Sequence, residues 1–165
     1  RDNMNKFVLL LCFLLFLNFS KCEETVNYEQ YYDYLVKVLQ GLCPNGEAEC
    51  AAIFINHKSQ LLPLLTNIIN DYRNGDDTTT IMARYMFSIM AIDTSLLTKC
   101  NIADLIGVMR TFDSVESIQA LGNRIANKSQ QILSNVQLLQ GAEGLENKLF
   151  YVGRILSLVL GFTVS

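Results

Sequence analysis

The fold is decided by residues 50–100, which read CAAIFINHKSQLLPLLTNIINDYRNGDDTTTIMARYMFSIMAIDTSLLTKC. The stretch begins and ends with a cysteine, and Cys50 and Cys100 are equally far along the chain from Gly75. Asn74-Gly75 is typical of a helix stop, and residues that face each other in an antiparallel helix pair lie equally far from its turn. The symmetry therefore predicts a helical hairpin, folded back at Gly75, whose arms are joined by a disulfide.

Both cysteines lie on the apolar stripe of their own arm. Steps of three or four residues place all members of each stripe on one face of a helix, so both sulfurs face the same seam. The pattern predicts one helix over residues 47–73, kinked at Pro63, and a second over 78–100. The first stripe comprises Cys50, Phe54, His57, Leu61, Leu64, Leu65, Ile68 and Tyr72, and the second comprises Met82, Tyr85, Ile89, Ile92, Leu96 and Cys100.

The rest of the chain has the same helical periodicity, whereas alternating strand-like runs are scarce. Asn27, with Gln30 three residues later, predicts the start of a first helix that ends near Gly41 and Pro44. Further helices are expected over 102–111, 114–140 and 145–160, and the last, apolar on most sides, should be buried. We therefore expect an all-α protein: a single-domain helical bundle of about five to six helices with a disulfide-stapled antiparallel helical hairpin.

Residues 1–22 have the pattern of a signal peptide. Lys6 precedes an apolar run over residues 7–17, which is shorter than the roughly 20 residues that a membrane span needs. Ser20 and Cys22 meet the small-residue requirement of a cleavage site. We expect cleavage after Cys22, which leaves residues 23–165 as one all-helical domain of a secreted or secretory-pathway lumenal protein. The alternative is a retained segment over 7–17, which would anchor the chain in a membrane.

A disulfide agrees with an oxidising compartment, but the pairing of the cysteines has alternatives. Cys43 and Cys50 are separated only by a short loop and could pair, leaving Cys100 as a free thiol. If cleavage precedes Cys22, then Cys22 could pair with Cys43. We prefer the pair Cys50 and Cys100, since both lie on the seam. A bridge across a loop of that length contributes about 4 kcal/mol in the chain-entropy model.

Charge and motifs argue against several classes of function. Removal of residues 1–22 leaves 10 basic against 15 acidic residues, a formal charge of −5, and without a basic patch we expect no nucleic-acid partner. A disulfide-bonded Cys50 could not act as a nucleophile beside His57, the only histidine. The acidic cluster around Gly75 lacks the spacing of a calcium loop, and a zinc site would need four ligands. We expect no catalytic site, metal or cofactor.

Two helices carry candidate contact faces. Tyrosines concentrate in the first helix, where their rings offer contact area to a partner, although packing inside the bundle is the commoner use. In the last helix small residues recur every four positions and form a groove that lets another helix approach closely. The candidate interface residues are Tyr28, Tyr31, Tyr34, Gly153, Ser157 and Gly161.

Asn127-Lys128-Ser129 matches the sequon for N-glycosylation and makes Asn127 the candidate acceptor in a secreted chain. Together these features indicate a non-catalytic helical protein that acts by binding or assembly, through a protein partner or self-association. One alternative is a carrier of a small apolar or lipid-like ligand, held in a cavity against the last helix. The other is a membrane-anchored accessory subunit, which requires residues 7–17 to be retained.

Overall fold

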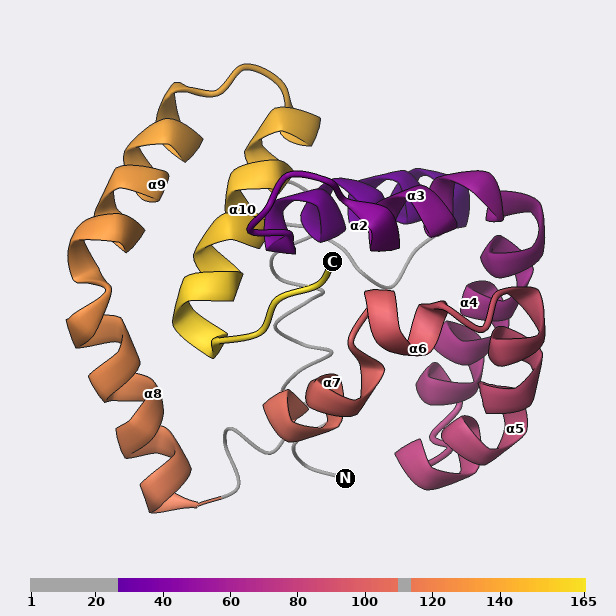
Figure 1. Ribbon diagram of the computed structural model, residues 1–165. Helices are drawn as coiled ribbons and strands as arrows, with labels where there is room; N and C mark the ends of the chain where they lie inside the picture. Colours follow the sequence, from indigo (N-terminus) through magenta and orange to yellow (C-terminus); the bar gives the residue numbers. More distant parts are fainter. Residues whose placement is uncertain (1–26, 110–113) are drawn as a thin grey trace.

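The computed structural model describes residues 27–109 and 114–165, which form nine helices and no strand (Figure 1). The predicted all-α class is confirmed. The helices are α2 (Tyr28–Leu42), α3 (Glu49–Asn56), α4 (Lys58–Arg73), α5 (Thr78–Ile92), α6 (Leu96–Lys99), α7 (Ile102–Met109), α8 (Val115–Asn127), α9 (Ser129–Gly141) and α10 (Leu145–Leu160).

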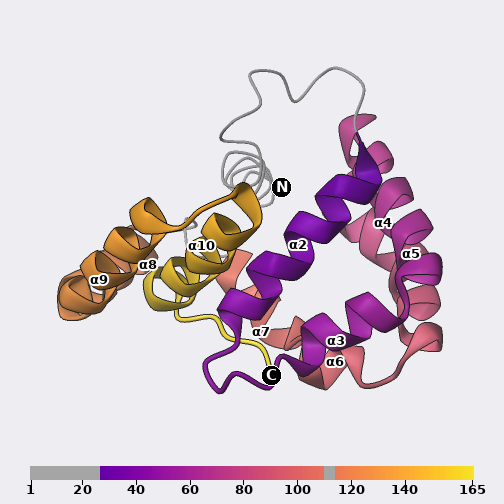
Figure 2. The ribbon, with the colours of Figure 1, turned by 90° about the horizontal axis from the view of Figure 1, so that it is seen from above.

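The helices lie in successive layers (Figure 2). Helices α8 and α9 follow one another as one bent arm, and both pack on α10. Helix α10 in turn crosses α2, and the hairpin of α4 and α5 lies beyond α2 on the far side. The short helices α3, α6 and α7 join these layers. The arm and the hairpin are thus separated by the α2–α10 pair.

Two glycines set the close approach of α2 and α10. A Cβ added to Gly41 would lie 2.0 Å from the backbone oxygen of Phe150, and one added to Gly153 would lie 2.2 Å from the backbone oxygen of Val38. No side chain fits at either position, so the two backbones are in direct contact. Around this crossing lie the most buried apolar side chains of both helices, among them Val38, Leu149 and Val152.

The predicted second and third helices are each divided in two. The second breaks at His57, between α3 and α4, rather than at Pro63, which lies inside α4. The third breaks at Asp93, whose Oδ1 accepts hydrogen bonds from the backbone N–H and the Oγ of Ser95. His57 and Asp93 are equally far from Gly75, and His57 Nε2 lies 3.6 Å from Asp93 Oδ2. Both halves of the hairpin therefore break at the same level.

The helix predicted over 114–140 is also divided, at Lys128, between α8 and α9. Three of the six expected helices are therefore split, and the prediction of five to six helices was too low. The helix predicted over 47–73 breaks at His57 and not at Pro63, which lies in the second turn of α4, where the carbonyl of Ser59 loses its helical partner. The kink at Pro63 stays a prediction.

Residues 161–165 follow α10 without regular secondary structure and contribute to the core. Phe162 and Val164 are buried. The backbone N–H of Val164 donates to the oxygen of Leu42 at 3.2 Å, and that of Ser165 donates to the oxygen of Lys99 at 2.8 Å. In return the backbone N–H of Cys50 donates to the oxygen of Ser165, also at 2.8 Å. This segment thereby links α2, α3 and α6.

Candidate binding surface

The base of the hairpin carries the predicted cysteine pair. The sulfurs of Cys50 and Cys100 lie at disulfide distance, 2.08 Å, and both residues are buried. Cys43, the rival partner, is a buried free thiol whose Sγ accepts a hydrogen bond from the backbone N–H of Ala48 at 3.3 Å. Cys22 lies outside the described residues. Beside the cysteine pair, Lys99 Nζ lies 2.8 Å from Glu49 Oε2. The two halves of the hairpin are therefore joined at this end by an ion pair as well.

The tip of the hairpin is closed by charged groups. Arg84 Nη1 donates to Asp71 Oδ2 at 2.5 Å and to Asp76 Oδ2 at 3.0 Å, and the hydroxyl of Tyr85 also donates to Asp71. The hydrogen bonds from Tyr85 and Arg84 hold the pKa of Asp71 below its usual value. Asp77 instead caps α5, accepting from the backbone N–H of Thr80. Within the described part of the chain, no group of three or more acidic, histidine or cysteine side chains could hold a metal ion.

The candidate tyrosines of α2 differ in exposure. Tyr34 is buried, and its hydroxyl accepts a hydrogen bond from Gln30 Nε2 at 2.6 Å. Tyr28 and Tyr31 are half-buried, and the Tyr28 hydroxyl donates to Asn70 Oδ1 of α4 at 2.5 Å. Burial raises the pKa of Tyr32, whose hydroxyl donates to the backbone oxygen of Phe54. The ring surface of α2 is therefore used to a large extent within the chain.

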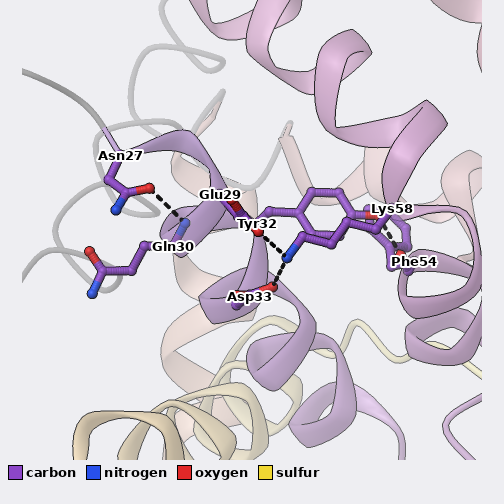
Figure 3. Close-up of polar contacts among 7 residues, drawn as sticks. All are labelled: Asn27, Glu29, Gln30, Tyr32, Asp33, Phe54 and Lys58. Carbon is purple, nitrogen blue, oxygen red and sulfur yellow. Dashed lines mark hydrogen bonds and ion pairs between the residues drawn. The ribbon is translucent and has the colours of Figure 1, made fainter.

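Lys58 reinforces the same seam between α2 and α4 (Figure 3). Its Nζ lies 2.9 Å from Asp33 Oδ1 and 3.1 Å from Glu29 Oε1. These hydrogen bonds, with Asp33 the stronger influence, raise the pKa of Lys58. Asn27 caps the start of α2 by accepting from the backbone N–H of Gln30 at 3.1 Å, as the sequence predicts.

The small residues of α10 have three different local roles. Gly153 is buried against Gly41 inside the chain. The Ser157 hydroxyl donates to the backbone oxygen of Arg154 at 2.7 Å. Gly161 caps the helix in the left-handed conformation with a φ of +66°, and the side chain of Arg124 lies over it. The groove expected from their spacing is therefore occupied at Gly153 by α2.

Among the described residues, five of the eight exposed large apolar side chains lie on the arm of α8 and α9, although the most exposed single one, Phe87, lies on α5. We call four residues of the arm the outer stripe: Val115, Ile118, Ile125 and Leu133, with exposed fractions of 71%, 51%, 40% and 58%. Neither helix of the arm contains a fully buried residue. Leu121, Ile132, Val136 and Leu139 of the arm are half-buried, and Leu121 and Leu139 pack against the core.

One signal in the sequence could have identified the outer stripe. A helix that packs on one neighbour needs an apolar arc of roughly 100°. Val115, Ile118, Leu121 and Ile125 span a wider arc than that, because successive residues are turned by about 100°. The excess width indicates a second face, which one packing partner cannot cover.

Two cavities lie beside the N-terminal half of α10. The larger, about 500 Å³, is lined by four carboxylates, Glu29, Asp33, Glu143 and Glu146, among other residues. The smaller, about 380 Å³, lies between α9 and α10 and is lined by Leu138, Phe150 and Tyr151 together with polar groups. The last helix contributes two aromatic side chains to the smaller cavity, and its apolar contribution to the larger one is Leu145.

The sequon lies at the break of the arm. Asn127 is the last residue of α8, and Asn127, Lys128 and Ser129 are all exposed. Successive helical residues are turned by about 100°, so Asn127 projects from the side of α8 opposite to Ile118 and Ile125. A glycan there would leave the outer stripe accessible.

The expected signal peptide over residues 1–22, and with it the alternative of a membrane anchor over 7–17, lies outside the described residues. None of the helices in residues 27–109 and 114–165 is long and apolar enough to cross a membrane. Comparison of the chain with protein-family models, with curated proteins and with solved structures found no match.

Proposed function

We propose that this chain is a secreted or lumenal helical protein that acts by binding or assembly and not by catalysis. The observation that carries the proposal is the outer stripe. Four large apolar residues at helical spacing are 40% to 71% exposed on an arm without a buried residue of its own. Contiguous exposed apolar surface mostly marks an interaction site, whereas single exposed apolar side chains are ordinary.

The arm suits this role because little else depends on that face. Helices α8 and α9 pack on α10, and the hairpin does not contact them closely. Binding on the outer stripe would therefore need no rearrangement of the core. Arg124 fixes the arm to α10, since its Nε donates to the backbone oxygen of Val159 at 2.8 Å. A rigidly held face costs little conformational entropy when it binds a partner.

The experiment compares the size of the native complex between two double variants. Ile118→Glu with Leu133→Glu places charge on the outer stripe, and Asn123→Glu with Gln130→Glu places the same charge on exposed polar positions of the same helices. Expressed in its native source, the control should sediment as the unaltered chain does, and the outer-stripe variant should sediment as a smaller species. Equal sedimentation of all three, with unchanged circular dichroism, would contradict binding through this face.

Secretion has its own test, the intact mass of the protein from its native source with and without reductant. We expect a chain that begins at Glu23, gains two hydrogen atoms on reduction, and carries a glycan at Asn127. A mass that still includes residues 7–17 would favour the membrane-anchored accessory subunit instead. The intact mass reports signal-peptide cleavage, the disulfide and the glycan independently. Each of these three predictions can therefore fail without the others.

A carrier of a small apolar ligand is the second candidate, and one observation favours it: Phe150 and Tyr151 of α10 line the smaller cavity with Leu138. The volume of about 380 Å³ is within the range of small-molecule sites. Native mass spectrometry of the protein from its source tests this directly. A bound apolar molecule that is lost in Leu138→Glu would support a carrier, and a bare chain would count against it.

A further inference from the structure

We propose that Asn45, in the loop between α2 and α3, is a site of spontaneous deamidation in the folded chain, and that the fold suppresses the same reaction at Asn74. Each of these two asparagines is followed by a glycine, Gly46 and Gly75. Glycine hinders the reaction least, because it has no Cβ. The reaction needs no binding partner and is therefore independent of the proposed function.

Deamidation at Asn45 is an attack by the backbone nitrogen of Gly46 on the side-chain amide. The nitrogen gives up its proton to solvent and forms a bond to Cγ of Asn45. The bond from Cγ to Nδ2 then breaks, and that nitrogen leaves as ammonia. Water opens the resulting five-membered ring at either of its two carbonyls. One opening gives aspartate, and the other gives isoaspartate, in which the main chain runs through the former side chain.

The backbone nitrogen of Gly75 is held away from the side chain of Asn74. Its N–H donates to the backbone oxygen of Tyr72 at 3.0 Å. Asn74 ends α4 with a ψ of −3°, which aligns the Gly75 nitrogen with the backbone nitrogen of Asn74 and not with its Cβ. The backbone N–H of Asn74 is itself bonded to the oxygen of Asn70 at 2.9 Å. Ring closure at Asn74 therefore requires the end of α4 to open first.

Asn45 and Gly46 lack these restraints. Within residues 27–109 and 114–165, neither of the two makes a hydrogen bond. Both are exposed, but exposure does not distinguish the two sites, because Asn74 and Gly75 are exposed as well. The distinguishing feature is the hydrogen bond of the glycine nitrogen, which is present at Gly75 and absent at Gly46. The attacking group is thus free only in the loop between α2 and α3.

The surroundings of the loop can accommodate the product. A Cβ added to Gly46 would meet nothing within 4 Å, so a changed main chain at this position has open space around it. The new carboxylate lies near the exposed Glu47, and repulsion between charges that are both in water is small. We therefore expect chains modified at Asn45 to stay folded and to accumulate as the protein ages.

The first test is peptide mapping of the purified, disulfide-containing full chain after weeks at neutral pH and body temperature. The peptide that contains Asn45 should gain one mass unit, in separate aspartate and isoaspartate forms. The gain should be about 10-fold faster or more than at Asn74, where a hydrogen-bonded helix end has to open before attack. Equal rates at the two sites, a faster rate at Asn74, or no modification of Asn45 would overturn the proposal.

The second test separates the effect of the fold from that of the sequence. The same chain is incubated in urea with its cysteines reduced, so that the hydrogen bonds at the end of α4 are lost. Asn45 and Asn74 should then react at similar rates. If Asn74 stays slower by the same factor as in the folded chain, then the neighbouring residues and not the fold suppress its reaction, and the proposed protection is wrong.

The third test uses matched variants of the two asparagines. Asn45→Gln should abolish the acidic species that isoelectric focusing detects in aged samples, because glutamine would have to form a larger ring. Asn74→Gln is the control, and it should form the acidic species as fast as the unaltered chain does. Circular dichroism checks that both variants are folded. An equal amount of the acidic species in Asn45→Gln would assign the reaction to another residue and overturn the proposal.

Discussion

The hairpin of α4 and α5 and the arm of α8 and α9 are both pairs of consecutive helices, but they are held in different ways. Contacts join its two halves at three levels: Arg84 with Asp71 at the tip, His57 with Asp93 where both halves break, and, between α3 and the end of α6, Cys50 and Cys100 at disulfide distance. The arm instead depends on α10. The difference indicates that contacts between its own two halves determine the conformation of the hairpin. The position of the arm is instead determined by its packing on α10.

The largest expected effect tests the cross-link at the base. Replacing both Cys50 and Cys100 by Ser should lower the free energy of unfolding by about 4 kcal/mol, because the bridge closes a loop of 50 residues in the unfolded chain. Urea unfolding measures this change, and hydrogen exchange should report faster opening of α3 to α6. Cys43→Ser is the matched control. It should stay sensitive to reductant, and a loss of that sensitivity would mean that Cys43 belongs to the bridge.

The next effect concerns the crossing that separates the two regions. Gly153→Ala should cost about 3 kcal/mol of unfolding free energy, since its Cβ would lie 2.2 Å from a backbone oxygen of α2 that cannot move alone. Gly122→Ala, in the open part of the arm, should stabilise the monomer by about 0.5–1 kcal/mol. Thermal unfolding at low protein concentration measures both. Equal effects of the two substitutions would contradict the close contact of α2 and α10.

The smallest effect is local to the tip of the hairpin. Because folding lowers the pKa of Asp71, its stabilising contribution is complete above the ordinary aspartate pKa and is lost as the pH falls through the lower, folded-state value. Asp71→Asn should therefore be less stable than the unaltered chain at neutral pH, and the difference should shrink in acid. Urea midpoints between pH 7 and pH 2 measure it. A difference that is independent of pH would show that Asp71 contributes through shape and not through charge.

The sequence predicts local features of this fold well. The caps at Asn27, Asp77 and Ser114 accept from the backbone N–H three residues later, and such contacts depend only on neighbours in the chain. The cysteine pair could be predicted because symmetry about one turn fixes which positions meet.

The breaks at His57 and Asp93 could not be predicted, since the two side chains meet only after the hairpin has folded. For the outer stripe the sequence offers one signal, the width of its apolar arc. Periodicity identifies an apolar face, but how much of that face α10 covers depends on how the helices pack in the folded chain.

The segment of residues 161–165 has a consequence for the order of events in biosynthesis. Both cysteines leave the ribosome before Phe162, Val164 and Ser165 do, and a chain that is synthesised from its N-terminus folds its early parts first. An oxidant can therefore reach the sulfurs while this stretch is still absent. In the folded chain Ser165 bonds to the backbone of Lys99 and Cys50, and both cysteines are buried. We therefore expect a disulfide that forms early and becomes buried later, and its rate of reduction should report how often residues 161–165 detach.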